Sequence, residues 1–214
     1  MSEYILDLPV SRDLARSLKL GDTVFLRGDA VITAGYPTHQ RLMDCVEEGR
    51  PPPVSLDGGA FFHLGCMSRE EEGTLRPLYV NPTTSTRFNA FMPPIIEHFG
   101  LTIIGGKGGL DDACVAAMKK TGCVYLSILG GGAPLLTEGI EAICETGWND
   151  LIVQFRLSRV RLDMFGPLTV AIDAHGNSVY ADLNASDPVS VDVFGLAGAD
   201  AVVAQAGVDP VCAG

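Results

Sequence analysis

The sequence predicts an α/β domain with a mixed sheet, built in β/β/α layers. Two strand–turn–helix units follow one another in the middle of the chain. Leu101–Ile104 leads through Gly105–Gly109 into a helix, and Val124–Leu129 leads through Gly130–Gly132 into another. This alternation favours helices packed on a sheet. The segments before and after these units are richer in strand patterns, which predicts a mixed rather than a purely parallel sheet.

The individual elements follow from the spacing of apolar residues and from turn residues between them. Pro93 and Pro94 should kink or interrupt the predicted helix Ser85–Phe99, because neither proline can donate a backbone hydrogen bond. The predicted strands are Thr23–Leu26, Ala60–Leu64, Leu78–Val80, Leu101–Ile104, Val124–Leu129, Ile152–Phe155, Leu168–Ile172 and Ser178–Ala181. The predicted helices are Thr38–Glu48, Ser85–Phe99, Asp111–Thr121 and Leu135–Glu145.

The length and composition are those of one globular domain covering residues 1–214. Of the 214 residues, 47% are hydrophobic and 19% charged, which excludes a disordered chain. No apolar run approaches the roughly 20 residues that a membrane span needs. The first residues carry acids and no basic segment, so we expect no signal peptide and a cytoplasmic protein. Residues 185–214 form either one more packed element or a variable tail.

The chain is acidic, with 15 basic and 26 acidic residues and a net charge of −11. A nucleic-acid partner is therefore not expected, because phosphate binding needs a clustered basic face. If the ligand is an anion, a few basic residues must build a local positive pocket against the overall field.

The six cysteines show no metal-binding spacing. Since no two of them are separated as in a CxxC motif and no secretory signal precedes them, reduced thiols packed in the core are expected. We predict no metal site made by this chain alone. The cysteines are Cys45, Cys66, Cys114, Cys123, Cys144 and Cys212.

The first candidate site is the glycine-rich loop Gly105–Gly109, which has Lys107 at its centre. Glycines let a backbone approach a ligand closely, and the lysine supplies positive charge. A nucleotide P-loop is excluded, because the residue after Lys107 is glycine and not serine or threonine. Gly130–Gly132 likewise fails the dinucleotide fingerprint. The alternative for both loops is a tight turn between a strand and a helix.

The second candidate is the hydroxyl-rich run Asn81–Arg87, which is predicted to open a helix. Backbone N–H groups at a helix N-terminus bind anions. Thr83 and Arg87 are four residues apart, so a hydroxyl and a guanidinium could face one site. The alternative is a helix-capping cluster with a solvated arginine.

The third candidate is Ile172–Asn177, where a strand ends in Asp173 and His175 beside a Gly-Asn turn. On its own this pattern is also that of a hydrogen-bonded β-turn. The separate histidines His39 and His63 could each be structural.

In this order, the motifs together resemble the beta subunit, or fused C-terminal domain, of class I iron–sulfur fumarases and L-tartrate dehydratases. The resemblance covers roughly residues 5 to 182. Its landmarks are Gly21-Asp22, Ala60-Phe61-Phe62-His63, Pro82-Thr83-Thr84-Ser85-Thr86-Arg87, Gly106-Lys107-Gly108-Gly109, Phe165-Gly166-Pro167-Leu168 and Ile172-Asp173-Ala174-His175-Gly176-Asn177.

The resemblance implies a swivelling β/β/α domain that closes over a site on a partner. That partner is an alpha subunit whose own cysteines carry a [4Fe–4S] cluster, with one iron open to the substrate. It implies a hydro-lyase that hydrates or dehydrates a small dicarboxylic acid such as fumarate, malate or tartrate. A hetero-oligomer with the alpha subunit is expected, and a homodimer is the alternative for the isolated chain.

The resemblance also assigns roles to residues. Thr83 matches the proposed catalytic base, and Arg87 and Lys107 match residues that hold substrate carboxylates. Gly106, Gly108 and His39 are expected at the substrate as well. Thr84, Asp173 and His175 are expected to support these residues from behind.

The chain departs from the family where an Arg-Asp pair usually precedes the histidine matched by His39. Gly35 and Tyr36 stand there, which suggests a roomier end of the site for a larger or less charged substrate group. Two further departures are Cys66 for a common proline and Ala174 for a common threonine. A non-catalytic ligand-binding or regulatory domain is the alternative function. Retention of Thr83, Arg87 and Lys107 together favours the enzyme.

Overall fold

The computed structural model describes residues 1–181, apart from the side chains of residues 133 and 134. The predicted tail at residues 185–214 and Cys212 lie outside the described part. The strands are β1 Glu3–Asp7, β2 Thr23–Thr33, β3 Ala60–Glu71, β4 Thr74–Pro82, β5 Ile103–Gly106, β6 Val124–Ser127, β7 Ile140–Gly147 and β8 Leu157–Ile172. The helices are α1 Arg12–Ser17, α2 Tyr36–Glu48, α3 Met92–Phe99, α4 Asp112–Thr121 and α5 Ala133–Glu138, with 3₁₀ turns η1 Ser85–Phe88, η2 Gly130–Gly132 and η3 Val153–Phe155.

The strands form a mixed sheet, as predicted, in the order β1-β2-β3-β5-β6-β8-β7, with β4 paired to β3. Pairing is parallel from β1 through β6, and β8 runs antiparallel to β2, β6 and β7. Because β8 pairs with both β2 and β6, the circuit β2–β3–β5–β6–β8 closes on itself. The layered β/β/α arrangement and its swivelling motion remain predictions.

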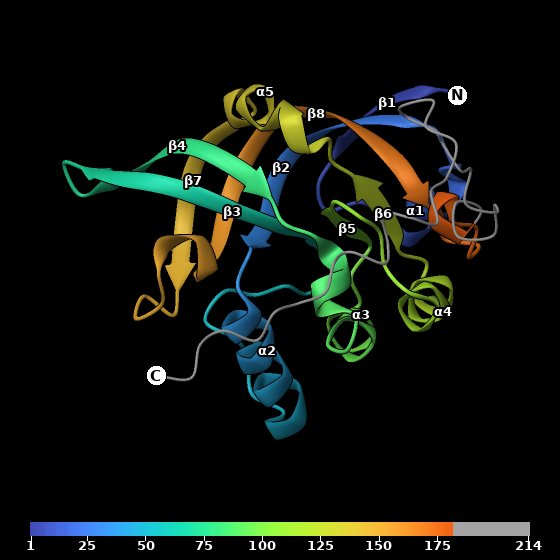
Figure 1. Cartoon of the computed structure of the whole chain (residues 1–214), viewed down its shortest axis with the longest axis horizontal. Coiled ribbons are helices and arrows are strands. Elements are labelled where there is room, and N and C mark those ends of the chain that lie inside the picture. Colours follow the sequence, from blue (N-terminus) through green and yellow to red (C-terminus); the bar gives the residue numbers. More distant parts are fainter. Residues whose placement is uncertain (182–214) are drawn as a thin grey trace, which may run out of the picture. The chain divides into compact units, whose positions relative to one another are not determined.

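The sheet separates two hydrophobic cores. Neighbouring residues on one strand point into different cores, with Phe62 and Ile103 in the first and Phe61 and Ile104 in the second. The second core lies under α2, α3 and α4, which stand together on one side of the sheet in Figure 1. Strands buried on both faces are apolar without alternation, which explains why the sequence showed them as continuous apolar runs.

Local signals define the ends of α4. Asp111 accepts a hydrogen bond from the Cys114 backbone N–H at 3.1 Å and so caps the first turn. Gly122 ends the helix with φ +79°, a left-handed conformation that glycine adopts without a side-chain clash. The predicted boundaries Asp111–Thr121 are therefore nearly correct.

Three predicted elements are wrong. The helix Leu135–Glu145 ends at Glu138, and the rest of it is the strand β7. The predicted strand Ile152–Phe155 is the 3₁₀ turn η3. Ser178 makes a single bridge to Ile172, and residues 179–181 are helical rather than extended.

Other elements differ in extent or were not predicted. The predicted helix Ser85–Phe99 is divided into η1 and α3, with the two prolines in the first turn of α3, where a missing N–H costs little. Neither β1 nor α1 was predicted from the sequence. The strands β2, β3 and β8 are longer than predicted.

The β3–β4 ribbon extends away from the rest of the sheet (Figure 1). None of the helices in the described part has the length and apolar character needed to cross a membrane.

Candidate active site

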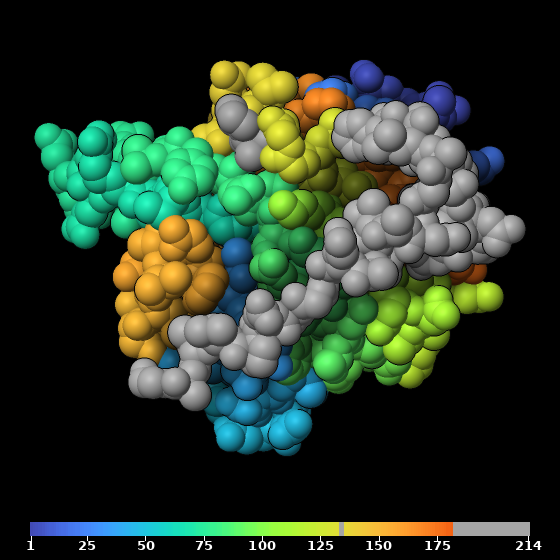
Figure 2. Space-filling model, in the orientation of Figure 1, coloured from blue at the N-terminus to red at the C-terminus, as the bar shows by residue number. Residues whose placement is uncertain are grey.

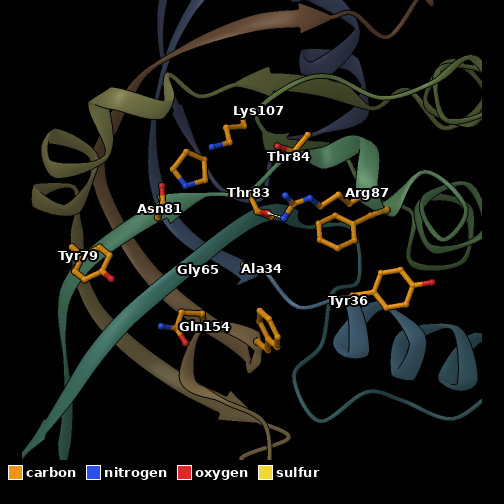
Figure 3. A pocket seen from close by; sticks show the side chains of 13 residues that line it. Ala34, Tyr36, Gly65, Tyr79, Asn81, Thr83, Thr84, Arg87, Lys107 and Gln154 are labelled. Atoms are coloured by element: carbon orange, nitrogen blue, oxygen red, sulfur yellow. Dashed lines mark hydrogen bonds between the residues drawn. The ribbon is translucent and has the colours of Figure 1, made fainter. Parts of the chain in front are cut away.

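A cleft of about 480 Å³ lies beyond the carboxyl ends of β2 and β5, where ligands commonly bind in α/β sheets (Figure 3). Segments far apart in the sequence meet there: the start of α2, the β3–β4 ribbon, η1, the loop after β5 and η3. The lining residues are Ala34, Tyr36, Gly65, Tyr79, Asn81, Pro82, Thr83, Thr84, Arg87, Phe88, Lys107, Gln154 and Phe155.

Backbone hydrogen bonds join the two loops that the sequence singled out. The Thr83 N–H donates to the His63 carbonyl at 3.0 Å, and the Lys107 N–H donates to the Thr83 carbonyl at 3.4 Å. The Ser85 N–H then donates to the Lys107 carbonyl at 2.8 Å. Thr84 and Lys107 form a parallel bridge. The loop after β4 is therefore held between β3 and the extension of β5, with Thr83 facing the cleft.

Arg87 turns back over Thr83. Its Nη1 donates to the Thr83 Oγ1 at 3.5 Å, as the spacing of four residues predicted (Figure 3). Arg87 lies in the 3₁₀ turn η1, and this turn brings the guanidinium back over Thr83, four residues earlier. A hydroxyl and a cation thus share one point in the cleft.

Lys107 supplies the second positive charge. The Lys107 side chain lies beside Gly130 of η2, because a β-carbon placed on Gly130 would be in ordinary contact with the Lys107 Nζ at 3.8 Å. Within residues 1–181, neither Arg87 nor Lys107 takes part in an ion pair, and no carboxylate lines the cleft. The cleft is therefore a local cationic site in an acidic chain.

Gly106 and Gly108 shape the loop and do not line the cleft. A β-carbon on Gly106 would overlap the Ser85 Oγ and lie 3.2 Å from the Tyr125 hydroxyl oxygen. Gly108 has φ +83°, which L side chains rarely adopt. These glycines allow the Lys107 loop to pack directly against the Thr83 loop. Substrate contact by either glycine stays a prediction.

His39 lies behind the cleft wall. Its ring stacks on Phe88 with centroids 3.8 Å apart and an angle of 6°, and its Nδ1 donates to the Gly35 carbonyl at 2.7 Å. Burial lowers the pKa of His39 to about 4, so the ring is neutral at physiological pH. His39 was expected to bind substrate, but the structure places it where it supports Phe88, which does line the cleft.

His63 is a second buried histidine, and its ring centroid lies 5.2 Å from that of His39. Burial lowers the pKa of His63 well below its ordinary value. Its Nε2 faces the Met92 sulfur at 3.3 Å. The backbone carbonyl of His63 is what fixes Thr83, and sequence reasoning had left this residue as structural.

Asp173 and His175 form a turn away from the lining. Asp173 accepts hydrogen bonds from the backbone N–H groups of His175 and Asn177, both at 2.9 Å. The His175 Nε2 donates to the Arg16 carbonyl at 3.0 Å, which ties this turn to α1. This arrangement supports the β-turn alternative, and a role behind the active site stays a prediction.

Gly35 does not make the cleft roomier, and that expectation is wrong. A β-carbon at Gly35 would lie 2.5 Å from the Thr38 Oγ1 and 2.7 Å from the Phe155 Cβ, so Phe155 already fills the space. Tyr36, by contrast, lines the cleft with its ring edge-on to Phe91 at 5.0 Å.

Sequence reasoning missed the wall opposite Thr83. Ala34, Gly65, Tyr79, Gln154 and Phe155 line this part of the cleft. These residues come together only through the pairing of β3 with β4 and the position of the η3 turn. No local sequence motif predicts either feature.

Comparison with known proteins decides the family, because the family described as Fumarase C-terminus matches residues 3–183. The chain belongs to the fumarase C-terminus family. The L(+)-tartrate dehydratase subunit beta of Escherichia coli (strain K12) is 33% identical over 178 residues, which are 83% of this chain and 87% of the relative. A Geobacillus stearothermophilus protein named "Putative fumarate hydratase class I" is 31% identical over 190 residues, 88% of this chain but 36% of the relative.

The match to the fumarase C-terminus family confirms the resemblance inferred from the motifs. All thirteen residues that line the cleft fall within the matched range.

Proposed function

We propose that this chain is the beta subunit of a [4Fe–4S]-dependent hydro-lyase acting on a small hydroxy dicarboxylic acid such as malate or tartrate. The observation that carries the proposal is the Thr83 hydroxyl held beside Arg87, with Lys107 in the same cleft. Names of relatives, a tartrate dehydratase subunit beta and a fumarate hydratase class I, support the reaction class.

Thr83, as an alkoxide whose own proton has first passed to solvent, would remove the proton from the carbon next to a substrate carboxylate. An ordinary hydroxyl is a weak base and needs a neighbouring charge to stabilise its alkoxide form. The Arg87 guanidinium, 3.5 Å from the Thr83 oxygen, is placed to do this. The backbone of Thr83 is fixed on both sides by hydrogen bonds, so its oxygen has a defined position.

Arg87 and Lys107 would bind the carboxylates. A guanidinium suits two-pronged binding of a carboxylate, and an ammonium acts as a point charge. As the proton leaves, negative charge builds on the adjacent carboxylate, and both cations stabilise it. Since neither cation is paired within the described residues, their charge is available to a substrate.

The cluster would belong to an alpha subunit, whose open iron would polarise the substrate hydroxyl as a Lewis acid. Among the described residues of this chain, no three His, Cys, Asp or Glu side chains lie close enough together to hold a metal ion. Burial also raises the pKa of the Cys66 thiol to about 11, which disfavours the thiolate form that binds iron. The described residues of this chain therefore do not form a set of cluster ligands, and what they would contribute is the base and the cations that bind the carboxylates.

The test is anaerobic co-expression with the alpha subunit from the same organism, followed by dehydration assays on malate, tartrate and methyl-substituted hydroxy diacids. We expect activity only with both chains, and a loss of kcat of about 100-fold or more in Thr83→Ala. Thr86→Ala is the matched control, because Thr86 lies in the same segment but does not line the cleft. It should retain wild-type kcat.

Two outcomes would contradict the proposal. One is unchanged kcat in Thr83→Ala. The other is a cluster-bearing complex that converts none of these acids, which would favour the non-catalytic ligand-binding alternative.

A further inference from the structure

The cleft changes in chemical character along its length. Thr83 and the two cations form one part of it, and three aromatic side chains form another. These are Tyr36, Phe88 and Phe155, which we call the aromatic wall. Figure 3 shows Lys107 on one side of the Thr83–Arg87 pair and Tyr36 on the other. A ligand that binds both cations therefore has an aromatic surface beside it.

Three segments that are distant in the sequence form the aromatic wall. Tyr36 begins α2, Phe88 ends η1 and Phe155 ends η3. The helix α2 lies against both of these 3₁₀ turns. Figure 2 shows α2 in blue next to the η3 region in orange. The three rings thus belong to one continuous side of the cleft.

The aromatic wall is held in place from behind. The Phe155 carbonyl accepts hydrogen bonds from the hydroxyl groups of Thr33, at 3.1 Å, and of Thr38, and both threonines are fully buried. The ring of Phe88 is stacked on the buried His39 ring. Because these contacts exist without a ligand, the wall is preorganised, and little conformational entropy is lost when a ligand packs against it.

The cations near the aromatic wall are engaged elsewhere. Arg41 on α2 donates to both carboxylate oxygens of Asp150, at 2.9 and 2.6 Å. Arg156 follows the wall directly but donates to two backbone carbonyls of its own loop, both at 3.1 Å. Among the described residues, the cations that line the cleft are Arg87 and Lys107. A third anionic group at the wall would lose hydration without gaining an ionic partner, whereas an apolar group is stabilised there.

We propose that the substrate is a hydroxy diacid with an apolar substituent, an alkyl or aryl group that packs on the aromatic wall while Arg87 and Lys107 hold the carboxylates. The inference rests on the proposed function for the reaction and adds the class of substrate. A single methylene in an apolar pocket changes kcat/KM by about 10–200-fold, so the wall is sufficient to select a substituted acid over malate.

The test measures the binding of compounds that cannot be dehydrated. Succinate and 2-benzylsuccinate both carry two carboxylates and lack the hydroxyl group that would leave. Their dissociation constants are measured by isothermal titration calorimetry, with full-length chain purified anaerobically after co-expression with the alpha subunit. We expect 2-benzylsuccinate to bind about tenfold or more tightly than succinate.

Tyr36→Arg should reduce this preference to about twofold or less, because it replaces part of the aromatic wall by a cation. Leu78→Arg is the matched control. Tyr36 and Leu78 are 51% and 49% exposed, and Leu78 does not line the cleft. The control should keep the wild-type preference within about twofold. Thermal unfolding of both variants must match wild type, so that a lost preference is not lost folding.

Equal affinity of wild type for the two compounds overturns the inference, and so does a preference that survives Tyr36→Arg. The reaction is assayed separately with malate and 2-benzylmalate. Dehydration of malate without any preference for the benzyl compounds would uphold the proposed function and refute the apolar substituent. Preferential binding of 2-benzylsuccinate without dehydration of any hydroxy acid would uphold the ligand class and refute the proposed reaction.

Discussion

At the scale of single residues, the candidate site depends on hydroxyl groups that the substrate would never touch. The Ser85 Oγ and the Tyr125 hydroxyl lie 2.8 Å apart in the interior, directly behind Gly106. Burial raises the pKa of Tyr125, so its phenol stays protonated and available for this hydrogen bond. Ser85 also donates its backbone N–H to the Lys107 carbonyl. Tyr125 is therefore a positioning residue for Lys107.

Removing this hydroxyl in Tyr125→Phe should leave the Ser85 oxygen without a partner and lower the free energy of unfolding by about 1–2 kcal/mol. The Lys107 loop should loosen, which raises KM for a carboxylate substrate more than it lowers kcat. Denaturant unfolding and steady-state kinetics measure the two effects. Tyr180→Phe, which removes a 3.2 Å hydrogen bond to Ser127, is the control for stability without a change in KM. Equal KM effects in both variants would refute the positioning role.

The roles of Gly35 and Tyr36 can be tested separately by substitution, because the two residues have different surroundings. Arginine at position 35 must displace Phe155, so Gly35→Arg should cost about 1–3 kcal/mol of stability. Tyr36 is half exposed and lines the cleft, so Tyr36→Arg should fold normally and lower KM for substrates with a second carboxylate. Thermal unfolding and KM across fumarate and substituted analogues test this. A Tyr36→Arg variant with unchanged substrate preference would show that this position does not select the substrate.

At the scale of elements, α2 and β3 are held together by a pair of neutral rings. His39 on α2 and His63 on β3 are both buried, and each has one ring nitrogen without a hydrogen-bond partner in the described residues. Adding a proton to either ring would place an unpaired charge in the interior. The stability of the packing between α2 and β3, the two elements that frame the cleft, therefore depends on pH.

The sign of this dependence follows from the lowered pKa of His39. The unfolded chain binds a proton below about pH 6.5, whereas the folded chain does so only near pH 4. The contribution of His39 to the free energy of unfolding is complete above pH 6.5. It decreases by about 3 kcal/mol as the pH falls through that window.

The variant His39→Phe keeps an aromatic ring against Phe88 but cannot titrate. Urea unfolding between pH 7 and pH 4 should show its pH slope reduced by about 1.4 kcal/mol per pH unit relative to wild type. His63 should contribute to the remaining slope in the same direction, because burial lowers its pKa as well. An unchanged slope would mean that His39 does not control acid stability.

The sequence predicted the elements whose signals are local. The β5–Lys107–α4 unit was visible because its apolar run, glycines and N-cap are adjacent in the chain. The joining of Thr83 and Arg87 was predictable from their spacing alone. Residues 140–145 were misassigned because Ile140, Ile143 and Cys144 fit a helical period, while their pairing with β8 overrides it. Gln154 and Phe155 reach the cleft through tertiary contacts that no local pattern encodes.

At the scale of the whole molecule, the strand that completes the sheet comes late in the chain. β8 pairs with β2, β6 and β7, and its partner β2 precedes it by more than a hundred residues. Until β8 is in place, β2 and β6 each present an open edge. The cleft lies at the ends of strands that this closure holds in register.

This arrangement constrains how the protein is made in the cell. During synthesis the ribosome releases β2 and β6 before their common partner β8 exists, so the nascent chain carries unpaired strand edges. A chain that stops at residue 156 should remain protease-sensitive and bind chaperones, whereas the full-length chain becomes resistant. Proteolysis of stalled nascent chains measures this. Resistance before β8 has emerged would show that the first strands form a stable unit by themselves.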